Sequence, residues 1–197
     1  MLNTISRTIG LSNDSIEFLE SQKILYKKNC WDIKKINLYK DESSKSFLNF
    51  ESNKSNFFMT SYNDFYKSLE DTLKKNKLIK IRKEKRDNSF LKLLKKNYEI
   101  IIISDTNNCL FKKYFNKQIK KNYNSVAFTT IINHNNIKNN TAEQYFTKFG
   151  PLAFLPISNT KTSVVFSVFD KDIIKNNSKV LELIKNYNRL YKIKNVN

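Results

Sequence analysis

The segment FGPLAFLPISNTKTSVVFSV, from Phe149 to Val168, constrains the fold of this chain more than any other. It holds one of the two glycines and both prolines. Two apolar runs rich in β-forming residues flank the polar turn Ser158 to Lys161, a pattern typical of a β-hairpin. The segment therefore predicts a hairpin built around one buried strand.

The length and composition of the chain predict a single globular domain. Its 197 residues, 13% of them aromatic, are enough for one hydrophobic core. The sequence contains neither a run of about 18 uncharged apolar residues nor a secretory leader pattern. Cys30 and Cys109 show no metal-ligand spacing and fit a reducing compartment. We therefore expect a soluble, cytoplasmic protein.

The net charge of +18 raises nucleic acid or an anionic membrane as a partner. Because the lysines are spread along the chain, a solvated basic surface is the preferred interpretation, since basic charge alone gives only non-specific affinity. The densest basic run, Lys74 to Arg86, is where a polyanion site would lie. The sequence has no recognition module for nucleic acid, so we predict no specific nucleic-acid partner.

Apolar periodicity predicts a mixture of helices and strands. Predicted helices span 14–22, 61–75 and 171–192, with a short one at 90–96. In the last long helix the residues predicted to face inward are Ile174, Leu181, Ile184 and Leu190. Strands are expected at 36–39, 47–50, 78–81, 98–104, 125–132, 149–157 and 163–169. The run YEIIIIS at 98–104 indicates a strand buried on both faces. The predicted fold class is α/β or α+β with a central mixed sheet.

The residues present exclude most catalytic constellations. His134 is the single histidine, so a histidine metal site or a histidine-activated nucleophile would depend on it alone. A loop histidine with no role is the preferred interpretation. Acidic pairs at 41–42 and 70–71 lie on a predicted turn and a helix surface, so no catalytic carboxylate pair is assigned. Gly10 and Gly150 are the only glycines, which rules out G-x-G-x-x-G and Walker loops.

Three ordered blocks resemble a known family. NNTAEQYF at 139–146, followed by the hairpin segment, resembles the N-T-A-x-x-x-F and G-P-L-A-L-L-P-L blocks of the ubiquinone-biosynthesis flavin hydroxylases. SRTIGLS at 6–12 resembles their R-T-x-A-L-S block. ISDTNNCLFK at 103–112 resembles their second nucleotide motif, G-A-D-G-A-N-S-x-V-R. The resemblance spans about residues 5 to 191.

The resemblance implies the fold of the aromatic-hydroxylase flavoproteins, in which a mixed sheet forms a roof over flavin and substrate. It implies an FAD-dependent monooxygenase that uses NAD(P)H as reductant and O₂ to hydroxylate a polyprenylated phenol. In such chemistry the cofactor supplies the reactive oxygen, and the protein supplies position and exclusion of water. The same resemblance implies association with the inner-membrane surface or with proteins of the ubiquinone pathway.

Site residues are implied by matching positions. Arg7 would lie near the flavin, and Asp105 with Asn108 would belong to the motif that contacts the nucleotide diphosphate. A strand would line the substrate side through Gly150, Pro151, Leu152, Phe154 and Pro156. Strand alternation places Leu152, Phe154 and Pro156 on one face and Ala153, Leu155 and Ile157 on the other. The sequence leaves open which face meets substrate.

The resemblance also implies an incomplete flavin site. The family begins with a βαβ unit whose glycine-rich turn holds the FAD pyrophosphate, and it later carries a G-D-A-A-H segment. This sequence contains neither, and Thr106 replaces a motif glycine. The implied organisation is a single incomplete domain over 1–197. It has FAD-binding remnants at 5–30 and 98–120, substrate-side sheet at 31–76 and 122–170, and a helix at 171–192.

Two functional hypotheses follow from the resemblance. The first is part of an FAD-dependent monooxygenase, inactive as this chain alone. The second is a diverged, non-catalytic remnant that acts as a binding or assembly protein. In either case an uncovered sheet edge or face predicts self-association.

Overall fold

The computed structural model describes residues 7–41, 43–81, 94, 96–107, 109–115, 119 and 121–196. The chain divides into a larger unit, Met1–Asn76 with Asn124–Asn197, and a smaller unit, Lys77–Tyr123. No helix in the described ranges combines the length and the apolar composition needed to cross a bilayer.

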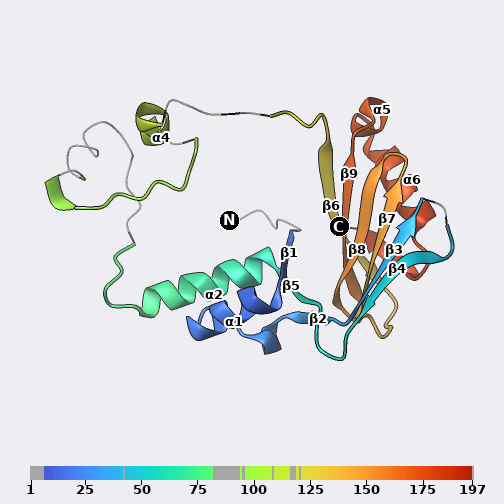
Figure 1. Ribbon diagram of the computed structural model, residues 1–197, viewed down its shortest axis with the longest axis horizontal. Coiled ribbons are helices and arrows are strands. Elements are labelled where there is room, and N and C mark those ends of the chain that lie inside the picture. Colours follow the sequence, from blue (N-terminus) through green and yellow to red (C-terminus); the bar gives the residue numbers. More distant parts are fainter. Residues whose placement is uncertain are drawn as a thin grey trace. The chain divides into compact units, whose positions relative to one another are not determined.

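A seven-stranded mixed sheet forms the body of the larger unit (Figure 1). Its strand order is β10-β6-β9-β8-β7-β3-β4. The strands are β3 (Lys35–Lys40), β4 (Ser46–Glu51), β6 (Val126–His134), β7 (Thr141–Thr147), β8 (Gly150–Ser158), β9 (Lys161–Val168) and β10 (Ile193–Val196). Neighbouring strands are antiparallel except β3 and β7, which run parallel. The predicted mixture of helices and strands around a large mixed sheet is confirmed.

Strands β8 and β9 form the predicted hairpin. Phe154 lies opposite Val164, and the Thr160 N–H donates to Ser158 Oγ in the turn. Gly150 begins β8 with a φ of 132°, and a Cβ placed there would lie 1.9 Å from the backbone oxygen of Ser167. The strand can therefore begin in this way only with glycine.

A second, three-stranded antiparallel sheet has the order β1-β5-β2. It comprises β1 (Thr8–Leu11), β2 (Trp31–Ile33) and β5 (Phe57–Ser61). Helix α1 (Asn13–Ser21) packs on this sheet through a small core of Ile16, Leu25 and Phe58. Helix α2 (Tyr62–Lys75) follows β5 directly and contributes Phe65 to the edge of that core. We call this element the small sheet and the seven-stranded one the large sheet.

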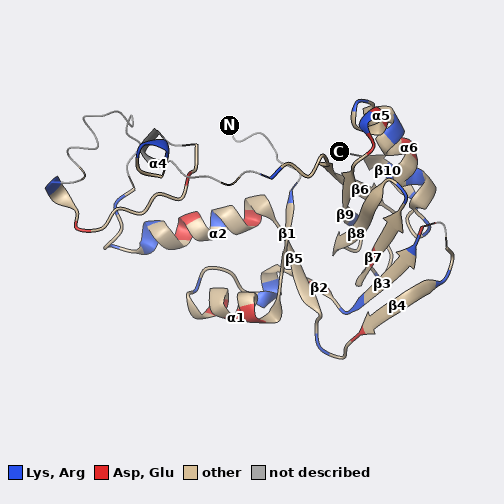
Figure 2. Ribbon diagram, turned by 45° about the horizontal axis from the view of Figure 1, so that its top comes forward, with Lys and Arg blue, Asp and Glu red and all other residues tan. Residues whose placement is uncertain are grey.

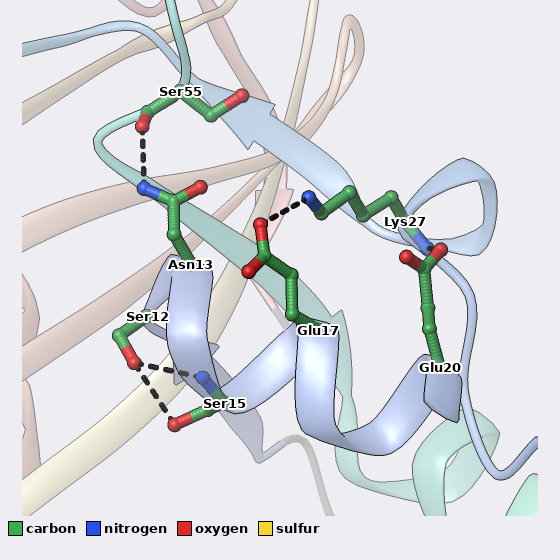
Figure 3. Close-up of polar contacts among 7 residues, drawn as sticks. All are labelled: Ser12, Asn13, Ser15, Glu17, Glu20, Lys27 and Ser55. Atoms are coloured by element: carbon green, nitrogen blue, oxygen red, sulfur yellow. Dashed lines mark hydrogen bonds and ion pairs between the residues drawn. The ribbon is translucent and has the colours of Figure 1, made fainter. Parts of the chain in front are cut away.

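Side-chain caps explain where these two helices begin. The Ser12 and Ser61 hydroxyls accept hydrogen bonds from the backbone N–H groups of Ser15 and Asp64, as expected for N-cap serines. After α1, the short 3-10 helix η1 (Lys27–Asn29) is tied back to it. The Lys27 N–H donates to Glu20 Oε1 at 2.7 Å, and the Lys27 ammonium pairs with Glu17 at 3.0 Å (Figure 3). The predicted boundaries of both helices are confirmed to within a residue or two.

Two helices cover one face of the large sheet, α5 (Lys171–Ile174) and α6 (Asn177–Tyr187). The single helix predicted for 171–192 is wrong, because Asn176 interrupts it. Its side chain accepts from the N–H groups of Ser178 and Lys179 and so starts a new helix. The predicted inward face is also shifted. Ile184 is buried and Ile174 packs against the core, but Leu181 and Leu190 are exposed, and Val180 and Tyr187 are buried in their place.

The smaller unit contains helix α4 (Cys109–Tyr114). The strand predicted for 98–104 is wrong: the segment has no regular secondary structure, and Ile100 and Ile102 are 78% and 88% exposed. Residues 78–81 form no strand either. An apolar run becomes a strand only where a neighbour pairs with it, and the described residues provide none here. The helix predicted for 90–96 falls largely outside the described residues.

Candidate functional site

The two faces of the large sheet have different surroundings. On one face Leu152, Phe154, Val164 and Phe166 pack beneath α6 and are almost fully buried. We call it the helix-covered face. The alternate residues of β8, Ala153, Leu155 and Ile157, are half-buried and lie on the opposite side, which we call the open face. Farther along the open face Phe146, opposite Pro151 on β8, is 45% exposed and packs near Phe47 at 6.0 Å between ring centres.

The small sheet packs on part of the open face. Leu155 and Ile157 contact a buried cluster of Ile33, Met59 and Ala142. Two hydrogen bonds hold the sheets together: the Thr8 hydroxyl donates to Ser163 Oγ at 2.8 Å, and the Trp31 indole N–H donates to the Asn139 carbonyl. The small sheet is thereby fixed against the open face near the turn end of the β8–β9 hairpin.

A groove of about 550 Å³ lies where the two sheets meet. We call it the inter-sheet groove. Its apolar lining comes from Trp31 and Met59 on the small sheet and from Ile131 and Ile157 on the large one. Its polar lining comes from Lys28, Asn29, Cys30, Thr60, Ser61, Asp64, Ser158 and Lys161. The groove is concave, as small-molecule sites are, but four apolar residues among twelve make its lining more polar than is usual for such sites.

The charged groups of the groove differ in how they are held. Asp64 is engaged in the α2 cap, where its carboxylate accepts from the Ser61 hydroxyl. Lys28 and Lys161 are exposed at the border of the groove. Burial raises the pKa of the Cys30 thiol, while a hydrogen bond with Thr60 acts in the opposite direction. A thiol with a raised pKa is a poor nucleophile at neutral pH, so Cys30 serves as a lining residue.

The substrate-side residues predicted on β8 separate between the two faces. Leu152, Phe154 and Pro156 are buried on the helix-covered face, and Gly150 is buried at the start of the strand. Pro151 is exposed at the far end of the open face. The groove contains Ile157, which the alternation assigned to the other set. Their substrate-side role stays a prediction.

The predicted flavin residues lie in different parts of the chain. Arg7 is exposed just before β1, and its carbonyl accepts from the Tyr62 N–H at 2.9 Å, at the start of α2. Asp105 belongs to the smaller unit, is exposed, and accepts from the Asn107 N–H at 3.0 Å in a local turn. Asn108 lies outside the described residues. Contacts of these three residues with a flavin remain predictions.

A buried carboxylate lies under the helix-covered face. Glu143 is 4% exposed and accepts hydrogen bonds from the hydroxyls of Tyr39 at 3.1 Å and Tyr145 at 3.0 Å. The two tyrosine rings stack 4.6 Å apart, and the Arg189 guanidinium lies 5.8 and 5.5 Å from their centres. Burial raises the pKa of Glu143, against the effects of these hydroxyls and of Arg189. The cluster lies on the side of the sheet opposite the groove and forms part of the packing beneath the helix-covered face.

His134 is not the loop residue predicted from the sequence. It is the last residue of β6 and is 2% exposed. Its Nε2 lies 3.0 Å from the Thr162 hydroxyl, and its ring lies 4.5 Å from that of Tyr191, a phenol whose pKa burial raises to about 12. Asn139 joins this network by donating to Ser158 O at 2.7 Å. The histidine therefore helps to fix the end of the hairpin.

Sequence reasoning missed most residues of the groove. Trp31, Met59 and Ile131 come from segments far apart in the chain, and no local motif marks them as neighbours. The one available signal was Lys161 in the polar turn of the hairpin. A turn residue is usually interpreted as solvated, so the signal was weak.

No protein-family model matches the chain. No curated protein matches its sequence. Solved structures do match its fold. A variant of PqsL from P. aeruginosa matches with a TM-score of 0.58 and 11% identity over 92% of this chain and 53% of its own. FqzB matches with a TM-score of 0.52 and 9% identity over 83% and 44%. The tetracycline destructase Tet(51) has a TM-score of 0.45 and 12% identity over 97% and 58%.

These findings correct the family resemblance. The assignment to the ubiquinone-biosynthesis hydroxylases is wrong, because no family model or curated relative supports it and the structures that match with a TM-score above 0.5 are PqsL and FqzB. The sequence blocks identified strands of a fold rather than a pathway. The chain spans about half the length of the structures it matches. At these identities the likeness establishes the fold alone.

Proposed function

We propose that this chain forms the ligand-facing sheet of an FAD-dependent monooxygenase, and that the inter-sheet groove is where the flavin ring and an apolar substrate bind. The single observation that carries the proposal is this groove of about 550 Å³, held between two sheets in a fold of the flavin-monooxygenase type. Apolar side chains from both sheets give it two walls on which a flat ring can pack.

The groove suits a flat ring better than a dinucleotide. A flavin diphosphate is usually bound by backbone N–H groups of a glycine-rich turn at a helix N-terminus. Gly10 instead lies within β1, opposite Met59, and a Cβ there would make an ordinary 3.5 Å contact with Met59 Sδ. Gly150 is closed by the Ser167 backbone. Neither of these two glycines is therefore placed to bind a phosphate through its backbone N–H.

A flavin reduced by NAD(P)H would supply oxygen activation if it bound here. The residues of this chain would position the ring between Trp31 and Ile157 and keep water from it. The described residues offer no turn that would bind the diphosphate of FAD. We therefore expect this chain alone to bind apolar rings without catalysing their oxidation. The same observation favours a second candidate function, a non-catalytic binding protein that uses the same groove.

Trp31 provides the test, because it is the single tryptophan and it lines the groove. Riboflavin carries the flavin ring without the diphosphate, so titrating Trp31 fluorescence with riboflavin and with FAD separates the two parts of the cofactor. We expect both to quench Trp31 with similar dissociation constants. Ile131→Phe should fill the groove and weaken riboflavin binding by about tenfold, the equivalent of about 1.4 kcal/mol.

The matched control is Thr129→Phe, which places the same ring two residues away on the same face of β6, outside the groove. It should leave riboflavin binding unchanged. Absence of quenching by either flavin would overturn the proposal. Binding of FAD a hundredfold more tightly than riboflavin would show a diphosphate site and overturn the claim that the chain lacks one. Oxygen consumption with FAD and NADPH distinguishes the monooxygenase from the binding protein.

A further inference from the structure

Strand β6 has one edge that is covered over only part of its length. Along its first edge it pairs with β9 from Val126 to Asn133. Along its second edge β10 pairs only with the last residues, Ile132 to His134. Within the described part of the chain, no strand pairs with this second edge between Val126 and Ile131. We call this stretch the open edge.

The backbone groups that face the open edge belong to alternate residues. The Asn135 N–H donates to the Lys192 carbonyl on the β10 side, whereas the His134 N–H donates on the β9 side. Alternate residues of an antiparallel strand direct their N–H and C=O groups to opposite edges, so Ala127 and Thr129 direct theirs to the open edge. A row of backbone donors and acceptors of this kind fits another extended backbone rather than a small molecule.

The sequence of β6 lacks the features by which proteins protect a strand edge. VAFTTIINH contains no charged residue and no proline, although 36 of the 197 residues of the chain are Lys or Arg. The neighbouring β10 carries Lys194, and β4 at the other end of the sheet carries Glu51. Figure 2 shows β6 without either sign of charge, whereas α5 and α6 carry both. Charges and prolines are the usual means of preventing pairing at an edge, so the open edge is suited to pairing.

An apolar cavity of about 300 Å³ adjoins the open edge on the helix-covered face. Its lining includes Phe128 from β6, Val180 and Leu181 from α6, and Val196 at the end of β10. Phe128 is half-buried and Leu181 is 38% exposed. A strand paired with the open edge would place its side chains over this cavity and cover both residues.

We propose that the open edge pairs with the open edge of a second copy of this chain, antiparallel, about a twofold axis that passes between the two Phe128 residues. Two limits set this register. β10 occupies the edge from Ile132 onward, so the partner strand has to end opposite Ile131. β6 begins at Val126, and Asn124 before it has a φ of 51°, which takes the chain out of the extended conformation. The register centred on Phe128 is the longest twofold pairing that meets both limits.

This register satisfies the exposed groups on both copies. Ala127 of each copy lies opposite Thr129 of the other, and the two residues exchange both backbone hydrogen bonds. The two Phe128 rings meet as a cross-strand pair on the helix-covered face, at the cavity. A twofold contact joins a surface to itself, and an uncharged antiparallel strand does so without bringing together the lysines of two chains of net charge +18. The inference is independent of the proposed function, because it uses the edge of the sheet rather than the inter-sheet groove.

Matched pairs of charges test the register. Sedimentation velocity of the full chain over a wide concentration range should show a monomer–dimer equilibrium. Ala127 and Thr129 are exposed, so both positions accept a charge without disturbing the core. Ala127→Lys with Thr129→Lys places like charges opposite each other twice and should raise the dimer dissociation constant by at least about tenfold. Ala127→Glu with Thr129→Lys places opposite charges at the same positions and should keep it within about threefold of the wild-type value.

The two double variants differ in net charge, but at about 0.15 M salt charges more than about 8 Å apart are largely screened. Thermal melting of each variant checks that the fold is intact. Hydrogen exchange tests the wild type directly: the Ala127 and Thr129 amides should exchange more slowly at high protein concentration. The Phe128 amide, which faces β9, is the internal control and should exchange alike at both concentrations.

A chain that stays monomeric at the highest concentration would overturn the inference and leave the open edge to a strand of another protein. Equal weakening of the dimer by the two double variants would contradict the register centred on Phe128 and overturn it too. So would a dimer that neither double variant weakens, because its contact would then lie elsewhere.

Discussion

Successive residues of β8 belong to two different environments. Phe154 is 1% exposed and packs under α6, whereas Leu155, the next residue, is half-buried on the face that the small sheet covers only in part. Strand geometry imposes this alternation, and the elements packed on each side determine how deeply each set of residues is buried. The helix-covered face supplies most of the core, and the open face supplies the groove. One strand therefore contributes alternate residues to the main core and to the face on which the inter-sheet groove lies.

The largest expected effect comes from truncating the two faces in turn. Phe154→Ala should lower the free energy of unfolding by about 3–5 kcal/mol, because it leaves a cavity under α6. Leu155→Ala should cost only about 1–2 kcal/mol, since part of its surface is already hydrated. Urea unfolding of both variants measures the contrast. Equal losses for the two would show that the open face is as tightly packed as the covered one.

A smaller effect is expected at the start of the strand. Gly150→Ala should cost about 3 kcal/mol, because its φ of 132° disfavours any side chain and the new Cβ would collide with the Ser167 backbone. Gly10→Ala is the matched control, since its Cβ would meet only ordinary contacts with Met59 and Phe57. By thermal melting, the unfolding free energy of Gly10→Ala should lie within about 1 kcal/mol of the wild-type value. A tolerated Gly150→Ala would mean that the β7–β8 connection can shift.

The buried acid of the helix-covered face should produce a pH dependence of its own. Burial raises the pKa of Glu143 above its usual 4.5, so the folded state holds this proton more tightly than the unfolded state does. The contribution of Glu143 to stability is therefore fully present below pH 4.5 and is lost as pH rises through the folded pKa. Glu143→Gln removes this loss, so the variant should gain stability relative to the wild type as the pH rises from 4 to 7.

The measurement is the difference in unfolding free energy between wild type and Glu143→Gln at several pH values. Taking the difference cancels the other carboxyl groups. Glu182→Gln removes one carboxylate from an exposed side chain and is the matched charge control. A pH-independent difference for Glu143→Gln would indicate that its pKa is not raised in the folded state.

The local part of the fold could be predicted from the sequence. Ser12 and Ser61 mark the starts of α1 and α2 in the sequence, because an N-cap side chain accepts a hydrogen bond from a backbone N–H only three residues ahead. The hairpin around Ser158 to Lys161 is also local. The parallel pairing of β3 with β7 was not predicted, because it joins distant segments and depends on which strand edges remain available. The isoleucine run at 98–104 failed for the same reason: hydrophobicity shows what a segment can bury, not whether a partner is present.

The candidate site was harder to predict than the fold. The groove lies between two sheets joined by contacts such as Thr8 with Ser163 and Trp31 with Asn139, between residues more than a hundred positions apart. The alternation of β8 was predicted correctly, but the choice between its two faces was not, since that choice depends on where α6 and the small sheet pack. The family motifs failed in a related way. A G-P-L-A strand with a polar turn describes a hairpin of this fold and does not identify the reaction.

The parallel β3–β7 pair has a consequence for the order in which the chain folds. β3 and β4 can form a hairpin soon after they are synthesised, but β3 acquires its second neighbour only when β7 emerges, a hundred residues later. Until then the edge of β3 lacks its second neighbour, and the ring of Phe47 lacks its contact with Phe146. Long-range pairings of this kind slow folding and lengthen the exposure of strand edges. We expect the nascent chain to depend on chaperones until about residue 150 has been made, and the slow step of refolding to be closure of the sheet between β3 and β7.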